Sequence, residues 1–62
     1  MYDYVKQHYK VDPKVGQRVR HKELNVWGSV CRERASQAHY VMVRLDDKNF
    51  PVPCHPTALE YH

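Results

Sequence analysis

The chain has 62 residues, a formal net charge of +3 and 42% hydrophobic residues. A chain of this length forms one domain with a thin core, because it buries only about 60% of the surface that its unfolded form exposes. It contains neither an apolar segment of the roughly 18 residues that a membrane span needs nor a charged-then-apolar leader, so we expect a cytoplasmic protein with reduced thiols.

The basic charge is concentrated in the middle of the chain. Residues 14–44 hold seven cations and two acids, a net charge of +5, whereas the remaining residues hold three cations and five acids, a net charge of −2. Such a distribution would draw a polyanion toward one region of the surface, although a solvated basic face without a partner is also common.

The first segment has helical character. Residues 2–10 place Tyr2, Val5 and Tyr9 at helical spacing, which predicts a helix of about one to two turns. A helix this short is marginal alone, so its aromatic side chains must pack on the rest of the domain or on a partner. Pro13 ends the pattern, and the expected organisation is therefore an N-terminal helical segment (residues 1–13) followed by a β-barrel (residues 14–62).

The first two strand candidates carry most of the arginines. Residues 15–21 place Val19 inward and arginines outward, with Gly16 as a bend at the start. Residues 26–34 form the second candidate, in which Gly28 marks a strong bend or a close crossing of strands. Polar loops follow both segments.

The longest alternating run predicts a central strand over residues 40–45. Its side chains divide into a core face (Val41, Val43 and Leu45) and a solvent face (Tyr40, Met42 and Arg44). A polar turn over residues 46–49 ends the strand.

Prolines shape the last part of the chain. Residues 50–54 read as a short strand at a sheet edge, because Pro51 and Pro53 allow at most one well-paired side. A 3₁₀ or helical turn over residues 55–58 and a closing strand over residues 59–61 complete the chain. Five short strands with a tight turn before the last predict a mainly β fold, a five-stranded SH3-like barrel. The β-branched content and the period-2 runs oppose a three-helix bundle.

Three stretches resemble a group of small phage and prophage proteins with no assigned chemistry. They are YVKQHY and VGQRV within residues 4–19, HYVMVRLDD at residues 39–47, and CHPTALEY at residues 54–61. The resemblance covers most of the chain and implies a phage or prophage origin, with a small accessory role in the bacterial host cell. It implies no reaction.

A second resemblance is to the plasmid-encoded type II dihydrofolate reductases, which are tetramers of SH3-like barrels around one pore. Residues 16–20, 27–30 and 58–60 are similar to their framework segments. The catalytic pattern differs, because their Val-Gln-Ile-Tyr run matches VPCH at residues 52–55 and their pore lysine falls on His21. The likeness therefore implies the scaffold rather than the activity, and we expect no enzyme, catalytic residue or cofactor.

The leading functional prediction is a nucleic-acid-binding face. Guanidinium groups neutralise phosphates and aromatic planes accept stacked bases. The residues expected to form this face are Arg18, Arg20, Lys22, Trp27, Arg32, Arg34, Tyr40 and Arg44. Strand alternation places Arg18, Arg20, Tyr40 and Arg44 on the outer side of the sheet, whereas the same alternation need not include Arg32. A solvated surface whose arginine stems cover apolar rims is the competing interpretation.

The histidines and cysteines give weaker indications of function. Zinc ligands usually come in pairs two to four residues apart, whereas Cys54 and His55 are adjacent and point in opposite directions on an extended chain, so we expect no metal site. We expect Cys31 and Cys54 to be buried apolar groups rather than a disulfide. In the segment His55-Pro56-Thr57, a His or Thr side chain is expected to cap the turn.

The alternative function is a protein-interaction module, monomeric or homodimeric, that binds or inhibits a host protein. Its candidate contacts are Tyr2, Tyr4, Tyr9 and the proline-flanked edge at residues 50–54, since aromatic anchors and incompletely paired strands are common interface material.

Overall fold

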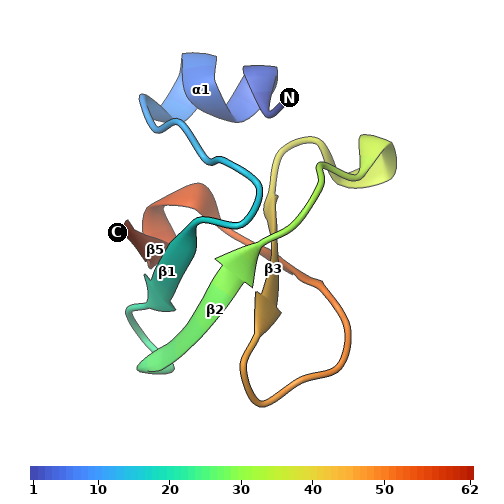
Figure 1. Ribbon diagram of the computed structural model, residues 1–62. Coiled ribbons are helices and arrows are strands. Elements are labelled where there is room, and N and C mark those ends of the chain that lie inside the picture. Colours follow the sequence, from blue (N-terminus) through green and yellow to red (C-terminus); the bar gives the residue numbers. More distant parts are fainter.

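A computed structural model describes residues 1–62. Its elements, in chain order, are α1 (Asp3–Tyr9), β1 (Arg18–His21), β2 (Val26–Val30), the 3₁₀ turn η1 (Ala35–Gln37), β3 (Val41–Leu45), β4 (Val52–Cys54), the 3₁₀ turn η2 (Pro56–Ala58) and β5 (Leu59–Tyr61). The strands form one antiparallel sheet in the order β4-β3-β2-β1-β5, which curls into a half-barrel with α1 across one end (Figure 1). The predicted mainly β, SH3-like fold, with its short N-terminal helix and its 3₁₀ turn before the last strand, is confirmed.

The inner face of the sheet and one side of α1 share a single core. Alternation within the strands turns one set of side chains inward, and nine of the buried residues form one cluster: Tyr2, Val5, Val19, Val30, Val41, Val43, Leu45, Cys54 and Leu59. Tyr2 and Val5 belong to the helical segment and the other seven to the strands. The N-terminal helix therefore packs on its own barrel and contributes to the same core.

Tyr2 joins the helix to the sheet through its hydroxyl group. Its side chain is fully buried, and its hydroxyl donates to the carbonyl of Cys31 at 2.6 Å and accepts from the backbone N–H of Met42 at 3.1 Å. Cys31 and Met42 continue the register that pairs β2 with β3, and the N–H of Cys31 donates to the carbonyl of Met42 at 2.7 Å. The phenol thus stands in for the second hydrogen bond of that pair.

A bulge bends the chain at the start of β1. Gly16 has a φ of 89°, and its N–H donates to the carbonyl of Val30 at 2.8 Å, while the N–H of Val30 donates to the carbonyl of Gln17 at 2.9 Å. Two residues on one strand therefore oppose one on the other, which is a β-bulge with glycine in the left-handed position. The expected bend at Gly16 is present.

The proline-flanked strand β4 lies at the edge of the sheet, as predicted. Met42 turns its backbone carbonyl toward β2, so its partner on β4, Pro53, occupies a position whose backbone nitrogen faces away from β3. Pro51 lies just before β4, so neither proline removes a hydrogen bond from the β3–β4 ladder.

Several details differ from the sequence-based expectation. β1 begins at Arg18 rather than at residue 15, and β4 begins at Val52 rather than at residue 50. Alternation predicts that Met42 faces solvent, but its side chain is 1% exposed; it lies outside the main core cluster, and its neighbours across the sheet are Pro53 and Cys31. The middle strand of the sheet is β2 rather than β3. β2 also ends at Val30 rather than at residue 34, because at the next residue, Cys31, the Tyr2 hydroxyl takes the place of one ladder hydrogen bond to Met42.

Candidate functional site

The sheet presents two rows of polar and aromatic side chains on its outer face. The register aligns Arg18 with Ser29 and Ser29 with Arg44 in one row, and Glu60 with Arg20 and Arg20 with Trp27 in the other. His62 continues the first row, because its N–H donates to the carbonyl of Arg18 at 3.0 Å. We call this surface the outer sheet face; its members are Arg18, Arg20, Trp27, Ser29, Arg44, Asp46, Glu60 and His62.

Arg18 is held at one end of this face by a carboxylate. Two of its guanidinium nitrogens donate to the two carboxylate oxygens of Asp46, at 3.0 and 2.7 Å, and the side chain also donates to the hydroxyl of Ser29 at 3.0 Å. The hydrogen bond from Arg18 lowers the pKa of Asp46, and Arg44 lowers it further through its charge. The same bond raises the pKa of Arg18.

Arg20 is held in the same way by Glu60. Its Nε and Nη2 atoms each donate to a carboxylate oxygen at 3.1 Å, and Nη1 donates to the side-chain oxygen of Asn25 at 2.9 Å. The imidazole of His62 lies 3.5 Å from the same carboxylate. The hydrogen bond from Arg20, with a smaller contribution from His62, lowers the pKa of Glu60.

Trp27 is the exposed aromatic side chain of this surface. It is 39% exposed, and its ring centroid lies 4.7 Å from that of His62, with 49° between the ring planes. Trp27 and His62 lie on either side of β1, so the two rings meet across that strand, between Arg18 and Arg20. An indole that is open on a sheet surface offers a plane on which another ring can stack.

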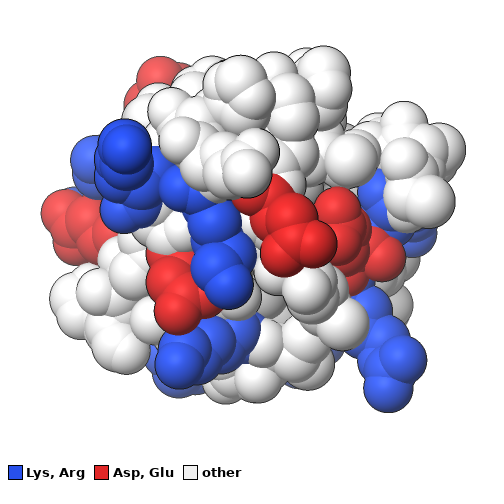
Figure 2. All heavy atoms as spheres, turned by 90° about the horizontal axis from the view of Figure 1, so that it is seen from above, with Lys and Arg blue, Asp and Glu red and all other residues white.

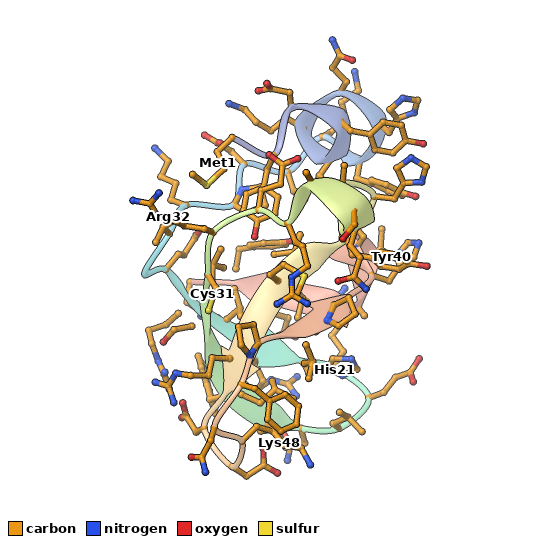
Figure 3. All side chains as sticks on the ribbon, turned by 90° about the vertical axis from the view of Figure 1, so that its right-hand side faces the viewer. Met1, His21, Cys31, Arg32, Tyr40 and Lys48 are labelled. Carbon is orange, nitrogen blue, oxygen red and sulfur yellow. The ribbon has the colours of Figure 1, made fainter.

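The other residues predicted for the nucleic-acid face lie elsewhere or point away. The Lys22 ammonium donates to the carbonyl of Thr57 at 3.1 Å, and Arg34 lies 3.5 Å from the side-chain oxygen of Gln37. Arg32 lies on the same side of the molecule as Met1, and Tyr40 lies on the opposite side of that view (Figure 3). Acidic and basic side chains alternate on the surface seen from the helix end (Figure 2). The structure therefore brings together Arg18, Arg20, Trp27 and Arg44, but not the complete predicted set.

A second aromatic cluster lies at the helix end and was missed by the sequence analysis. The ring of Tyr4 stacks on His8 of the same helix and on His39 from the loop before β3, with both centroid distances at 4.0 Å and interplanar angles of 22° and 11°. Tyr4 and His8 are four residues apart, the spacing that brings side chains together on a helix. That spacing was visible in the sequence, whereas the arrival of His39 required the fold. Residues 35–40 line a shallow hollow of about 210 Å³ beside this loop.

The cysteines and His55 have structural positions. Both cysteines are free thiols; Cys54 is buried as expected, whereas Cys31 is only partly buried. Burial raises the pKa of Cys54, which disfavours the reactive thiolate. The Nδ1 atom of His55 accepts a hydrogen bond from the Thr57 N–H at 3.2 Å, and Pro56 is the first residue of η2. The expected capping role of His55 is confirmed. No group of three or more His, Cys, Asp or Glu side chains is arranged to hold a metal ion.

Comparison with known proteins identifies no relative: no protein-family model, no curated protein and no solved structure matches the chain. The structure has no helix with the length and apolar character required to cross a membrane.

Proposed function

We propose that the outer sheet face binds single-stranded nucleic acid through one stacked base and a small number of phosphate contacts. The observation that carries this proposal is Trp27, an exposed indole on an open sheet surface, with arginines on its own row and the neighbouring row. Base–aromatic stacking contributes about 1–3 kcal/mol per base and tolerates any sequence. The chain would act as a non-enzymatic accessory protein.

The charge balance of this face limits how many phosphates it can neutralise. Three arginines face two carboxylates, Asp46 and Glu60, so the outer sheet face carries a net charge of about +1 with neutral histidine. Arg44 is exposed and has no carboxylate hydrogen-bonded to it. We therefore expect stacking to dominate, with Arg44 as the main phosphate contact.

The proposed cellular location and oligomeric state rest on the sequence resemblance and on the free thiols. A phage or prophage protein would act in the cytoplasm of the bacterial host, as a monomer or homodimer. Single-stranded DNA or RNA is abundant there during replication and transcription, and the proposed contact to a base plane does not distinguish the two.

The test is binding of a labelled single-stranded oligonucleotide at about 50 mM salt with micromolar protein. We expect Trp27→Ala to weaken binding by about tenfold to a hundredfold, corresponding to the loss of one stacked base. Phe50→Ala is the matched control, because Phe50 is an aromatic side chain with 58% exposure outside this face. Absence of binding by the wild-type protein, or equal effects of the two variants, would contradict the proposal.

The salt dependence provides an independent check. The logarithm of the affinity falls with the logarithm of salt concentration with a slope of about −0.7 for each phosphate neutralised on a single strand. One or two phosphates therefore predict a slope of about −1, and Arg44→Gln should make it shallower. A slope of about −4 would instead indicate a broad basic face that includes Arg32 and Arg34.

A protein partner is the second candidate function, and a different observation favours it. Tyr2, one of the contacts expected from the sequence, is fully buried in the core and is not available to a partner. Leu24, in the turn between β1 and β2, is 59% exposed, and Phe50, in the connection between β3 and β4, is 58% exposed. Exposed apolar side chains of this size are typical anchors in interfaces. Pull-down from host lysate with and without nuclease separates the two functions, because a protein-mediated complex survives nuclease and a nucleic-acid-mediated one does not.

The resemblance to the type II reductases leads to a third candidate function with its own requirements. Residues 52–55, which match the catalytic run of those enzymes, include the edge residue Pro53 and the buried thiol of Cys54. That activity would require a tetramer by light scattering and folate-dependent oxidation of NADPH. We place it below both binding functions.

A further inference from the structure

The contact between His62 and Trp27 differs from the two stacked ring contacts of Tyr4 at the helix end. Tyr4 and His39 stack with a 4.0 Å centroid distance and an 11° interplanar angle, which is close to parallel. His62 and Trp27 are 4.7 Å apart and tilted by 49°, so their planes overlap poorly. The outer sheet face therefore already carries a ring on its indole, but in a geometry that leaves much of the stacking surface unused.

The side chain of His62 is also weakly anchored. It is about half exposed and its imidazole reaches Glu60 at 3.5 Å, whereas the same carboxylate makes two 3.1 Å bonds to Arg20. Removal of the imidazole from the indole would leave the Arg20–Glu60 pair intact. The backbone of His62 remains tied to β1 through its bond to Arg18, so the side chain alone can rotate away.

We propose that His62 occupies the position of a nucleobase on Trp27, so that the site takes a single unstacked base in place of the imidazole. This inference rests on the proposed function and identifies both the ligand class and an intramolecular competitor for it. A base has a larger flat ring system than imidazole and can lie parallel to the indole, which a tilted His62 does not. Bases within a duplex have both planes covered, so the site takes single strands or an extruded base but not an intact duplex.

The first experiment compares oligonucleotide affinity for the wild-type protein and His62→Ala. The probe is a labelled thymidine octanucleotide, with a duplex of the same length as a second probe. Removal of the competitor should tighten single-strand binding by about threefold to tenfold and leave duplex binding unchanged. His62→Phe keeps a ring on the indole and should bind no more tightly than wild type, whereas His8→Ala, which removes a histidine at the helix end, serves as the control for charge.

The second experiment observes the displacement directly. Indole ring currents shift the NMR signals of the His62 ring protons while the two rings are in contact, and Trp27→Ala removes that shift. Saturation of the wild-type protein with the octanucleotide should move the His62 signals to the positions found in Trp27→Ala.

The outcomes separate this inference from the proposed function. If the wild-type protein binds and Trp27→Ala abolishes binding, but His62→Ala binds equally or more weakly, the base site stands and the competitor role of His62 is wrong. His62 signals that stay unmoved at saturation would likewise contradict the competitor role. If none of the variants binds the octanucleotide, both proposals are wrong.

Discussion

The hydrogen bonds of the Tyr2 hydroxyl and those of the outer sheet face illustrate opposite uses of hydrogen bonding in one small sheet. At the helix end, a buried phenol bonds to two backbone groups and one side of α1 enters the core. On the outer sheet face, Arg18 and Arg20 bond to carboxylates in contact with water. Buried hydrogen bonds are costly to break, whereas exposed ion pairs contribute little to stability. The first region should therefore determine whether the chain folds, and the second, which is the surface proposed to bind nucleic acid, should contribute little to stability.

The sharpest way to test this difference is to remove Tyr2. Tyr2→Ala deletes a fully buried aromatic side chain, and comparable truncations cost about 3–5 kcal/mol, which is a large share of the stability of a small domain. Tyr2→Phe should cost about 1–3 kcal/mol, because the Cys31 carbonyl and the Met42 N–H lose their shared partner. Chemical denaturation measures both values. A Tyr2→Phe variant as stable as wild type would show that the β2–β3 ladder closes without the phenol.

A substitution at Gly28 tests whether the stability of the protein depends on the inner side of β2 as strongly as on Tyr2. A Cβ atom at this position would lie 2.7 Å from Cγ1 of Val43 and 2.8 Å from the carbonyl oxygen of Arg44, so β3 would have to move. We expect Gly28→Ala to destabilise the protein by about 1–3 kcal/mol in thermal or chemical unfolding, as overpacked cores do. Ser29→Ala, at the next position and on the opposite face, is the matched control and should have a smaller effect.

Tyr61 is a second partly buried tyrosine, and its contribution to stability can be tested at alkaline pH. Its hydroxyl donates to the carbonyl of Pro56 at 3.0 Å, and burial, the largest cause, raises its pKa to about 12 from the ordinary value of 10.0. Since the folded state holds this proton more tightly than the unfolded state, the associated stability is complete below about pH 10 and is lost as the pH rises through 12. Unfolding measured between pH 9 and about 12 should therefore show decreasing stability, and Tyr61→Phe should flatten the profile. An unchanged profile in that variant would assign the effect to other groups.

The smallest stability effect is expected on the outer sheet face itself. The pKa values of Asp46 and Glu60 are lowered mainly by hydrogen bonds from Arg18 and Arg20. Their contribution is therefore present above the unfolded carboxyl pKa values of about 4 and is lost as the pH falls through the lower folded values. Asp46→Asn should barely change the unfolding midpoint at pH 7 and should reduce the acid dependence below pH 4. A large loss at pH 7 would contradict the separation of stability from binding.

The same variant makes a prediction about the ligand. Asp46→Asn releases Arg18 from its carboxylate, raising the net charge of the outer sheet face by one. If that face binds nucleic acid, the affinity for a single strand should rise and its salt dependence should become steeper. Asp47→Asn, an exposed neighbour for which the structure shows no ion pair, controls for the change in net charge.

Much of the fold could be predicted because it depends on local sequence patterns. The valines of β3, the bend at Gly16 and the edge position of β4 follow from alternation, from the left-handed backbone of glycine and from the missing N–H of proline. The hydroxyl of Tyr2 could not be placed, since its partners lie 29 and 40 residues away. The burial of Met42 likewise departs from the alternation of β3, in which Arg44 on the same face is exposed.

The candidate site was predictable only in part. Alternation correctly placed Arg18, Arg20 and Arg44 on one face, but the pairing of Arg18 with Asp46 spans 28 residues and that of Arg20 with Glu60 spans 40. These partners turn an apparently basic surface into a nearly balanced one. A count of cations along the chain cannot reveal such pairing, because it is set by the order of strands in the sheet.

The outward-facing nitrogen of Pro53 also limits how copies of the chain can associate. A growing filament of sheets requires two complementary edges on each subunit, whereas a closed pair can form through one edge used twice. Strand addition at β4 would meet Pro53, a position without an N–H donor, so this edge offers an incoming strand fewer hydrogen bonds than an unbroken strand would. Pairing of copies would therefore favour the other edge strand, β5, and the use of one edge twice gives a closed pair rather than an open filament.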